Sequence, residues 1–189
     1  AEIEKDLLFY DESGGGVTFS GGEPLAQAQF LDALLAVCNH REIHATLDTS
    51  GLAPGTVIDQ ILPRLQLVLF DLKIMDEQLH RQYTGVSNRT ILDNLQRMAG
   101  SRTPLRIRVP LIPGITDGDD NLTQIIRFAG NLKAIQGIDL LPFHRIGSDK
   151  YRRLGTADPM AGIGPPAPER VASIKQNFES AGFTVSIGG

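Results

Sequence analysis

The sequence predicts an α/β protein built around a parallel β-sheet, and two observations lead to this fold class. Short apolar runs alternate along the 189 residues with segments whose apolar side chains recur at helical spacing. The links between these segments are short, which is typical of βαβ units and therefore of parallel strands. Right-handed crossovers then permit either an open doubly wound sheet or a barrel.

Six short apolar runs are expected to be strands. The run Leu67–Phe70 is apolar throughout, which is typical of a parallel strand buried on both faces. The run that begins at Leu105 is expected to end at Pro110, and the one that begins at Ile138 leads into Pro142. The six strands are expected at residues 17–20, 44–47, 67–70, 105–109, 138–141 and 183–186.

Apolar residues at helical spacing predict helices between these strands. Gly182 is placed to cap the last helix, and a loop rich in Gly and Pro runs from Gly147 to about Pro168. No repeat or domain boundary is evident, so residues 1–189 are expected to form a single domain. The helices are expected at residues 30–38, 57–62, 91–98, 122–132 and 169–180, and the chain also begins with a helical pattern.

The composition excludes several classes of protein. Hydrophobic residues make up 41% and charged residues 21%, which is incompatible with a largely disordered chain. The formal net charge of -4 argues against nucleic-acid binding. No apolar run approaches the roughly 20 residues that cross a bilayer, and no signal peptide opens the chain. We therefore expect a cytoplasmic protein without a nucleic-acid or membrane partner.

The single cysteine, Cys38, excludes an intrachain disulfide and a cysteine-only metal site within this chain. It lies on the apolar side of a predicted helix, where a packed structural role is expected.

Charged and polar side chains follow the predicted strands. Because ligands of parallel α/β folds bind at the carboxyl ends of the strands, these side chains predict one convergent site. The alternative is that such residues only cap the following helices. The candidates are Glu23, Asp48, Asp71, Lys73, Arg108 and His144.

Two glycine-rich segments flank the first predicted strand. Gly14–Gly16 precede it, and Ser20-Gly21-Gly22-Glu23-Pro24 follow it. Glycines at this position let a ligand approach the backbone, whose carbonyl groups bind an ammonium, although a tight turn before a helix explains them equally well. Neither segment matches the dinucleotide-binding or Walker pattern.

The sequence resembles the activating enzymes of glycyl radical enzymes, a family within the radical S-adenosylmethionine (SAM) superfamily, over nearly its whole length. The stretch from Gly14 to Leu25, GGGVTFSGGEPL, carries the resemblance most strongly. It continues through LDTSG from Leu47, DLK from Asp71, YTGVSN from Tyr83, IR at Ile107, PG at Pro113 and LLPFH from Leu140.

The resemblance implies a partial (β/α)6 barrel with SAM lying across the strand ends. Lys73 would then lie close to the SAM carboxylate, and Arg108 and His144 on the side of the ribose and adenine, with Val109 and Leu111 lining the adenine. The SAM ammonium would meet Gly21, Gly22 and Glu23, and a monovalent cation is possible at Asp48, Thr49 and Asp71.

The resemblance also implies a reaction. In the family, a reduced [4Fe-4S] cluster cleaves SAM to methionine and a 5′-deoxyadenosyl radical, which removes a hydrogen from a glycine of a partner enzyme such as pyruvate formate-lyase. A flavodoxin or a ferredoxin-type protein supplies the electron. The cofactor performs the difficult step, so no residue of this chain is assigned as catalytic.

One departure from the family pattern concerns the cluster. The family carries C-x-x-x-C-x-x-C on a loop after the first barrel strand, and this sequence has no such motif. We therefore expect a fragment that lacks the cluster ligands and the first strand, and that is inactive alone. The exposed edge of the strand near Val17 would then favour self-association.

Two other hypotheses stay open at this point. One is a non-catalytic module that binds SAM or docks to a protein. The other, less favoured, is a sugar-phosphate aldolase with a barrel fold in which Lys73 forms a Schiff base.

Overall fold

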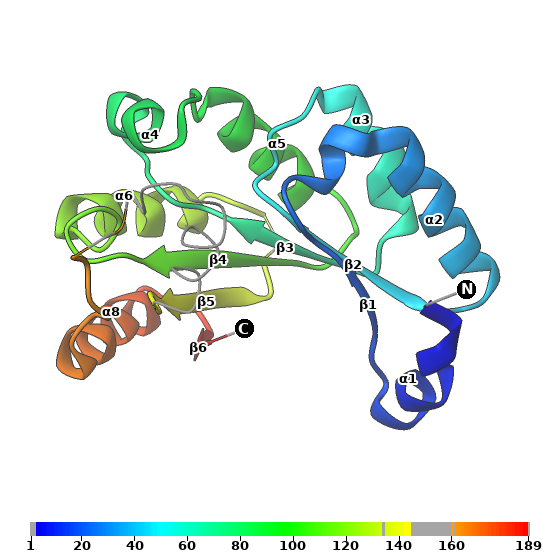
Figure 1. Cartoon of the computed structure of the whole chain (residues 1–189). Coiled ribbons are helices and arrows are strands. Elements are labelled where there is room, and N and C mark those ends of the chain that lie inside the picture. Colours follow the sequence, from blue (N-terminus) through cyan, green and yellow to red (C-terminus); the bar gives the residue numbers. More distant parts are fainter. Residues whose placement is uncertain (1–2, 134, 145–159, 161, 189) are drawn as a thin grey trace.

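The computed structural model describes residues 3–133, 135–144, 160 and 162–188. Its described strands form one parallel sheet in the order β1-β2-β3-β4-β5-β6 (Figure 1). The spatial order follows the chain without the reversal that defines a doubly wound sheet, so the sheet is a partial barrel whose edges are β1 and β6. The strands are β1 (Gly16–Phe19), β2 (His44–Thr49), β3 (Leu67–Asp71), β4 (Leu105–Leu111), β5 (Gly137–Pro142) and β6 (Val185–Ile187).

Helices connect the strands, and Figure 1 shows α2, α3, α4 and α5 along one side of the sheet, with α1 standing apart beside the start of β1. Three short 3₁₀ helices accompany them: η1 (Ile3–Asp6), η2 (Pro24–Gln27) and η3 (Leu62–Arg64). The α-helices are α1 (Leu7–Ser13), α2 (Ala28–His40), α3 (Gly55–Ile61), α4 (Glu77–Thr84), α5 (Arg89–Ala99), α6 (Asp119–Gly130) and α8 (Pro168–Ser180).

The two faces of the sheet differ in burial. On the face that packs against the helices, Phe70, Ile107 and Leu140 are completely buried and belong to the hydrophobic core. On the other face, Leu67 and Leu69 are only half-buried. The expectation that β3 is buried on both faces is therefore wrong, because the interior of this open barrel is lined by charged side chains and is not filled by a second apolar layer.

The register of the strands aligns three charged residues on this interior face. Asp71 of β3 pairs with Arg108 of β4, and Arg108 pairs with Asp139 of β5. Side chains of directly paired residues point to the same face of a sheet. The three charges therefore form a row across the barrel interior, level with the carboxyl end of β3.

Most element bounds shift by one or two residues from the sequence-based prediction, and two differences have a clear physical reason. Helix α4 was not predicted, because its two large apolar residues, Leu79 and Tyr83, are both exposed and give no buried stripe. Strand β4 does not end at Pro110 but continues to Leu111. The last hydrogen bond between the two strands runs from the N–H of Leu72, just after β3, to the Arg108 carbonyl. The backbone nitrogen of Pro110 faces the same side but lies beyond the end of β3. The missing N–H of Pro110 therefore costs no hydrogen bond of the sheet.

The prediction for the C-terminal helix is confirmed. Gly182 has a φ of 93°, its N–H donates to Glu179, and the N–H of Phe183 donates to Phe178, which is a Schellman cap. Most of the expected loop from Gly147 to Pro168 lies outside the described residues. Across the part of the chain that is described, we find no helix with the length and apolar character to cross a membrane.

Candidate functional site

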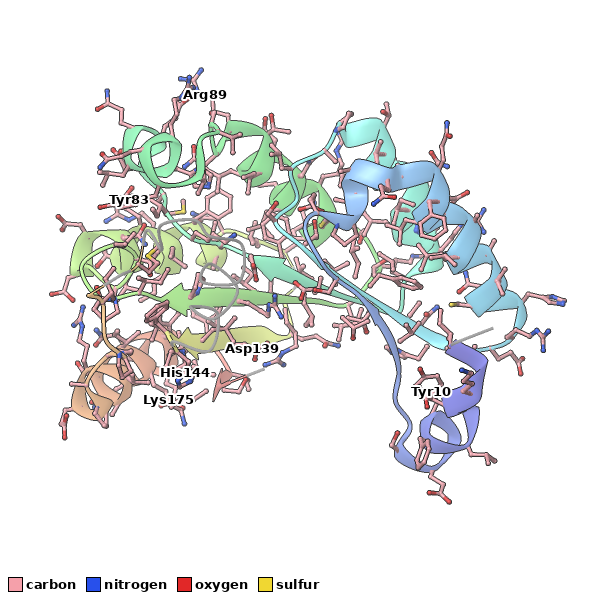
Figure 2. All side chains as sticks on the ribbon, viewed as in Figure 1. Tyr10, Tyr83, Arg89, Asp139, His144 and Lys175 are labelled. Carbon is pink, nitrogen blue, oxygen red and sulfur yellow. The ribbon has the colours of Figure 1, made fainter. Side chains whose placement is uncertain are left out.

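The residues predicted from the sequence lie at or near the carboxyl ends of the parallel strands. Glu23 follows β1, Asp48 and Thr49 end β2, and Asp71 ends β3. Arg108 lies within β4 but is level with the end of β3. The exposed His144 comes two residues after β5, and Figure 2 shows it together with Asp139 of that strand. The structure therefore places these side chains along one rim of the barrel.

Arg108 joins two carboxylates from neighbouring strands. Its Nε donates to Asp71 Oδ1 at 2.9 Å and its Nη2 to Asp48 Oδ1 at 2.5 Å. The hydroxyl of Ser20, at the end of β1, donates to the other oxygen of Asp48 at 3.0 Å. Burial opposes the charge of Arg108, but the ion pairs with Asp71 and then Asp48 outweigh it and raise the pKa of the guanidinium. One cation therefore holds the ends of β2 and β3 against β4.

Lys73 adds a second cation beside this group. Its Nζ lies 3.9 Å from Asp71 Oδ2, and its side chain is 39% exposed. The two carboxylates and two cations balance in formal charge, and the ammonium of Lys73 is the more accessible cation. It is therefore free to meet an anion at the rim.

Glu23 does not project freely into the site. Its Oε1 accepts from the Thr49 hydroxyl at 2.6 Å, and its Oε2 accepts from the N–H and the hydroxyl of Ser50 at 3.0 and 2.6 Å. The Thr49 side chain is buried and lies on the opposite face of β2 from Asp48. The structure thus brings Asp48 and Asp71 together around Arg108, but it leaves the Thr49 hydroxyl bonded to Glu23.

The backbone at Gly21 and Gly22 is open. Both residues are exposed, Gly21 has a φ of 128°, and a Cβ added at either position would meet nothing within 4 Å. A φ in this range is one that residues with side chains rarely adopt. A ligand can therefore reach the peptide groups of this loop directly.

Two apolar residues expected to line a ligand lie elsewhere. Val109 and Leu111 are completely buried in the core on the helix side of β4. Residues alternate in direction along a strand, so Arg108 facing the interior places both neighbours on the opposite face. The expectation that they contact adenine is wrong.

A second charged group, not predicted from the sequence, lies deeper in the barrel. Arg106 donates through Nε to Asp139 Oδ2 at 2.9 Å and through Nη2 to Oδ1 at 2.5 Å, and the Ser186 hydroxyl also donates to Oδ1. Burial opposes ionisation of Asp139, but the bonds from Arg106 and Ser186 lower its pKa overall. The alternation Arg106-Ile107-Arg108 and the lone acid in an apolar strand were the signals in the sequence.

These side chains border a hollow of about 400 Å³ on the interior face, lined by Leu69, Arg106, Arg108, Asp139, Ser186, Ile187 and Gly188. The hollow lies next to the Arg108 group, because Arg108 contributes to both. Charged side chains therefore line the part of the barrel interior that β3 to β6 form.

The thiol of Cys38 is separate from this site. Its side chain is 1% exposed in the core under α2, and burial raises its pKa. The expected packed role is confirmed. Among the described residues, no group of three or more His, Cys, Asp or Glu side chains is arranged to hold a metal ion. The residues present therefore do not fit a [4Fe-4S] cluster, which needs several thiolates.

The comparisons with known proteins agree with the partial barrel fold. The model of the radical SAM superfamily matches residues 1–128. The chain is 39% identical over 191 residues to the trans-4-hydroxy-L-proline dehydratase activating enzyme of Clostridioides difficile, covering 100% of this chain and 63% of that protein. It is 35% identical over 179 residues to pyruvate formate-lyase 1-activating enzyme of Escherichia coli K12, covering 94% of this chain and 73% of that protein.

A solved structure shows the same fold. A domain of the pyruvate-formate lyase-activating enzyme from Bacteroides vulgatus superposes with a TM-score of 0.79 at 33% identity, over 93% of this chain and 99% of that domain. The chain belongs to the radical SAM superfamily. Within it, the chain belongs to the activating enzymes of glycyl radical enzymes. It spans 63% and 73% of the length of the two curated relatives named above.

Proposed function

We propose that this chain is the SAM-binding core of an activating enzyme that generates a glycyl radical on a partner enzyme. The observation that carries the proposal is the rim itself. Two carboxylates held by Arg108, an accessible ammonium at Lys73 and open backbone at Gly21 and Gly22 lie at the ends of parallel strands. This set suits a ligand that carries both an ammonium and a carboxylate.

Within the proposal, the residues divide by the part of SAM that they suit. Carbonyl groups of Gly21 and Gly22 accept from its ammonium, and Lys73 meets its carboxylate. Arg108 and His144 lie on the side of its ribose and adenine. When bound and supplied with one electron by the donor, SAM would provide the capacity to remove a hydrogen atom from a glycine. The chain's own residues orient the molecule and limit the access of water.

The partner and the electron donor belong to the proposal as well. The relatives are named as activators of pyruvate formate-lyase, a dehydratase, and choline and isethionate lyases. The shared substrate class is therefore a glycyl radical enzyme, and the donor is a flavodoxin or a ferredoxin-type protein. Because the described residues offer no ligands for a [4Fe-4S] cluster, we expect this chain alone to bind SAM without cleaving it.

Titration calorimetry of the 189-residue chain with SAM tests the proposal. We expect measurable binding, and a loss of about tenfold in affinity on Lys73→Ala, as for a bond to a charged group. Lys133→Ala, which changes an exposed lysine beyond α6, is the matched control and should leave the affinity unchanged. A chain that binds no SAM at millimolar concentration would contradict the proposal.

A second assay tests the expected inactivity. The chain is incubated without oxygen with iron, sulfide, SAM and a strong reductant, and 5′-deoxyadenosine is quantified. We expect none above the level of a protein-free blank. Production of 5′-deoxyadenosine would show that a cluster assembles without the family's cysteine motif.

The Schiff-base hypothesis receives no support from the geometry. A lysine that forms a Schiff base at neutral pH is normally desolvated or placed beside another cation. Lys73 is 39% exposed and its nearest charged partner is the carboxylate of Asp71. Its environment is that of an ion-pairing lysine.

A further inference from the structure

Two asparagine side chains hold the short segment on which Lys73 stands. Asn121, in the first turn of α6, donates to the Lys73 carbonyl at 2.9 Å and accepts from the N–H of Met75 at 2.8 Å. Asn88, at the start of α5, donates to the carbonyls of Ile74 and Met75 at 3.1 and 2.8 Å. Four hydrogen bonds from two helices therefore replace the sheet bonds that end with β3.

The segment is also fixed by packing. Leu72 and Ile74 are 1% and 2% exposed, so Lys73 stands between two buried anchors. Its own side chain points out of this packing, with 39% exposure. The backbone of Lys73 is therefore held firmly, although its side chain keeps access to the rim.

Asn88 gives up its usual role in order to make these bonds. It occupies the N-cap position of α5, where an asparagine normally accepts from the first turn of its own helix. Here it makes no such bond. Its amide, in a residue that is 2% exposed, is directed to Ile74 and Met75 instead, and the N–H of Arg89 is met by the Ser87 hydroxyl. The donor of this side chain therefore serves the Lys73 segment, and α5 receives no side-chain cap from Asn88.

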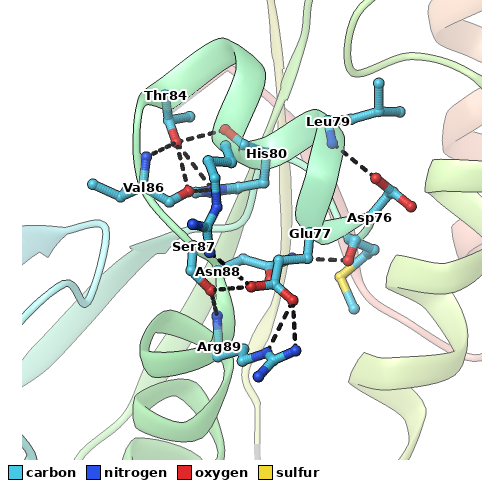
Figure 3. A network of polar contacts seen from close by, with 11 residues as sticks. Asp76, Glu77, Leu79, His80, Thr84, Val86, Ser87, Asn88 and Arg89 are labelled. Atoms are coloured by element: carbon cyan, nitrogen blue, oxygen red, sulfur yellow. Dashed lines mark hydrogen bonds and ion pairs between the residues drawn. The ribbon is translucent and has the colours of Figure 1, made fainter.

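The connection between α4 and α5 keeps Asn88 in place (Figure 3). Glu77 accepts from the Ser87 hydroxyl at 2.8 Å and from Arg89 Nε at 2.9 Å. The bond from Ser87, and also the charge of Arg89, lower the pKa of Glu77 despite the opposing desolvation. His80 Nδ1 lies 2.8 Å from the Val86 carbonyl, which makes this nitrogen the donor. The residues on both sides of Asn88 are therefore anchored to α4.

Asn121 links the Lys73 segment to the next strand. The same Nδ2 that bonds Lys73 also donates to the Thr116 carbonyl at 2.9 Å. The Thr116 hydroxyl accepts from the N–H of Ile112 at 2.7 Å and donates to the Pro110 carbonyl. Because Pro110 and Arg108 belong to the same strand, the position of Lys73 is fixed relative to the Arg108 group.

We infer that Asn88 and Asn121 are positioning residues that aim Lys73 at the carboxylate of SAM, an inference that rests on the proposed function. A long, flexible lysine binds an anion best when its backbone is already fixed, because less freedom is lost on binding. The two amides act through Lys73 and do not touch the ligand themselves.

A double-mutant cycle on SAM binding tests this inference. We expect Asn121→Ala to weaken SAM binding by about fivefold to tenfold, the range for one or two hydrogen bonds. In a Lys73→Ala background the same change should have no further effect, because the residue that it positions is gone. Binding of 5′-methylthioadenosine, which has no carboxylate, should be unchanged in every variant.

Controls separate positioning from general destabilisation. Thr103→Val removes the bond from the Thr103 hydroxyl to the Leu62 carbonyl at 3.0 Å, near the amino ends of the strands, and should alter neither affinity. Asn88→Ala repeats the double-mutant cycle from α5. If Asn121→Ala does not fold, Asn121→Asp replaces it in the cycle, because aspartate keeps the acceptor for the N–H of Met75 but loses the donor to the Lys73 carbonyl.

Three outcomes would overturn the inference. One is an unchanged SAM affinity in the folded Asn121 variants. Another is a loss of affinity in the Asn121 variants that is equal for SAM and 5′-methylthioadenosine, or equal with and without Lys73. Either result would indicate that Asn121 has a structural role only. The third is a parent chain that binds no SAM, which would overturn the proposed function at the same time. Normal SAM binding by the parent with either of the first two outcomes would overturn this inference alone.

Discussion

The carboxylate of Glu23 accepts two hydrogen bonds from Ser50, one from the backbone N–H at 3.0 Å and one from the hydroxyl at 2.6 Å. It also accepts from the Thr49 hydroxyl at 2.6 Å and the N–H of Leu25 at 3.2 Å. A carboxylate has about four acceptor sites, and these four donors fill them. Glu23 thus fastens the loop after β1 to the end of β2, while the backbone at Gly21 and Gly22 in that loop stays open.

This contact predicts that Glu23 acts mainly on stability. Glu23→Ala should lower the free energy of unfolding by about 2–4 kcal/mol, because the buried Thr49 hydroxyl and the Ser50 N–H lose their acceptor. Urea denaturation measures the change. Glu179→Ala, which removes an exposed helical ion pair with Lys175, is the control and should cost under about 0.5 kcal/mol. Unchanged stability with lost SAM binding would instead make Glu23 a direct ligand.

Arg108 should not be replaceable by lysine. Its planar fork reaches Asp48 and Asp71 together, whereas an ammonium is a point charge on a flexible chain. Arg108→Lys should lower the free energy of unfolding by about 1–3 kcal/mol at neutral pH, measured in urea, as expected for weakened bonds between charged groups.

Arg97→Lys is the matched control for this change. Arg97 also meets both oxygens of a carboxylate, that of Asp59, but the two side chains are 48% and 56% exposed. Its substitution should cost under about 0.5 kcal/mol, because solvent screens an exposed pair. Equal losses in the two variants would show that the interior group contributes no more than a surface ion pair.

Asp139 should make stability depend on pH on the acid side. Its pKa in the folded chain is lowered from the ordinary value of 3.8, so the unfolded chain takes up its proton first as the pH falls. Its contribution is therefore complete above about pH 4 to 5 and is lost as the pH falls through the folded pKa. Asp139→Asn should be less stable than the parent by about 2–3 kcal/mol at pH 7.

That difference should shrink steadily below pH 4, which urea denaturation at a series of pH values measures. Asp59→Asn, which removes an acid from an exposed pair, is the control, and its free energy of unfolding at pH 7 should differ from that of the parent by under about 0.5 kcal/mol. A difference between Asp139→Asn and the parent that stays constant down to pH 3 would mean that the bonds from Arg106 and Ser186 do not depend on the charge of Asp139.

The sequence was sufficient for the sheet and for the location of the rim. Apolar runs and helical spacing located six strands, and the rule for carboxyl ends placed Asp48, Asp71 and Arg108 on one edge. The face of the sheet to which each strand residue points was harder to predict. Val109 and Leu111 were expected beside a ligand, and only the alternation of β4, with Arg108 in the interior, assigns them to the core.

Contacts between distant loops were beyond the sequence. Glu23 was expected to face a ligand, but its partners lie 26 and 27 residues away, at the end of another strand. Asn88 carries the pattern of a helix cap, and only the packing of α5 against the Lys73 segment directs its amide elsewhere. Helix α4 was missed for another reason: it is strongly polar, and its two large apolar residues, Leu79 and Tyr83, are both exposed.

Gly51 should tolerate no side chain. It follows β2 in the left-handed region with a φ of 76°, and an added Cβ would lie 2.3 Å from a ring carbon of Phe70. That ring is completely buried, so it cannot move aside without disturbing the core. We expect Gly51→Ala to lower the free energy of unfolding by about 2–5 kcal/mol, the sum of backbone strain and overpacking.

Gly130→Ala, at the end of α6 with open space around the new methyl group, should leave stability unchanged or raise it by up to about 1 kcal/mol. Thermal and urea denaturation of the two alanine variants check this pair. Similar stability of both would mean that Phe70 and the end of β2 repack together, and that the Asp48–Arg108 contact tolerates a shift of its own strand.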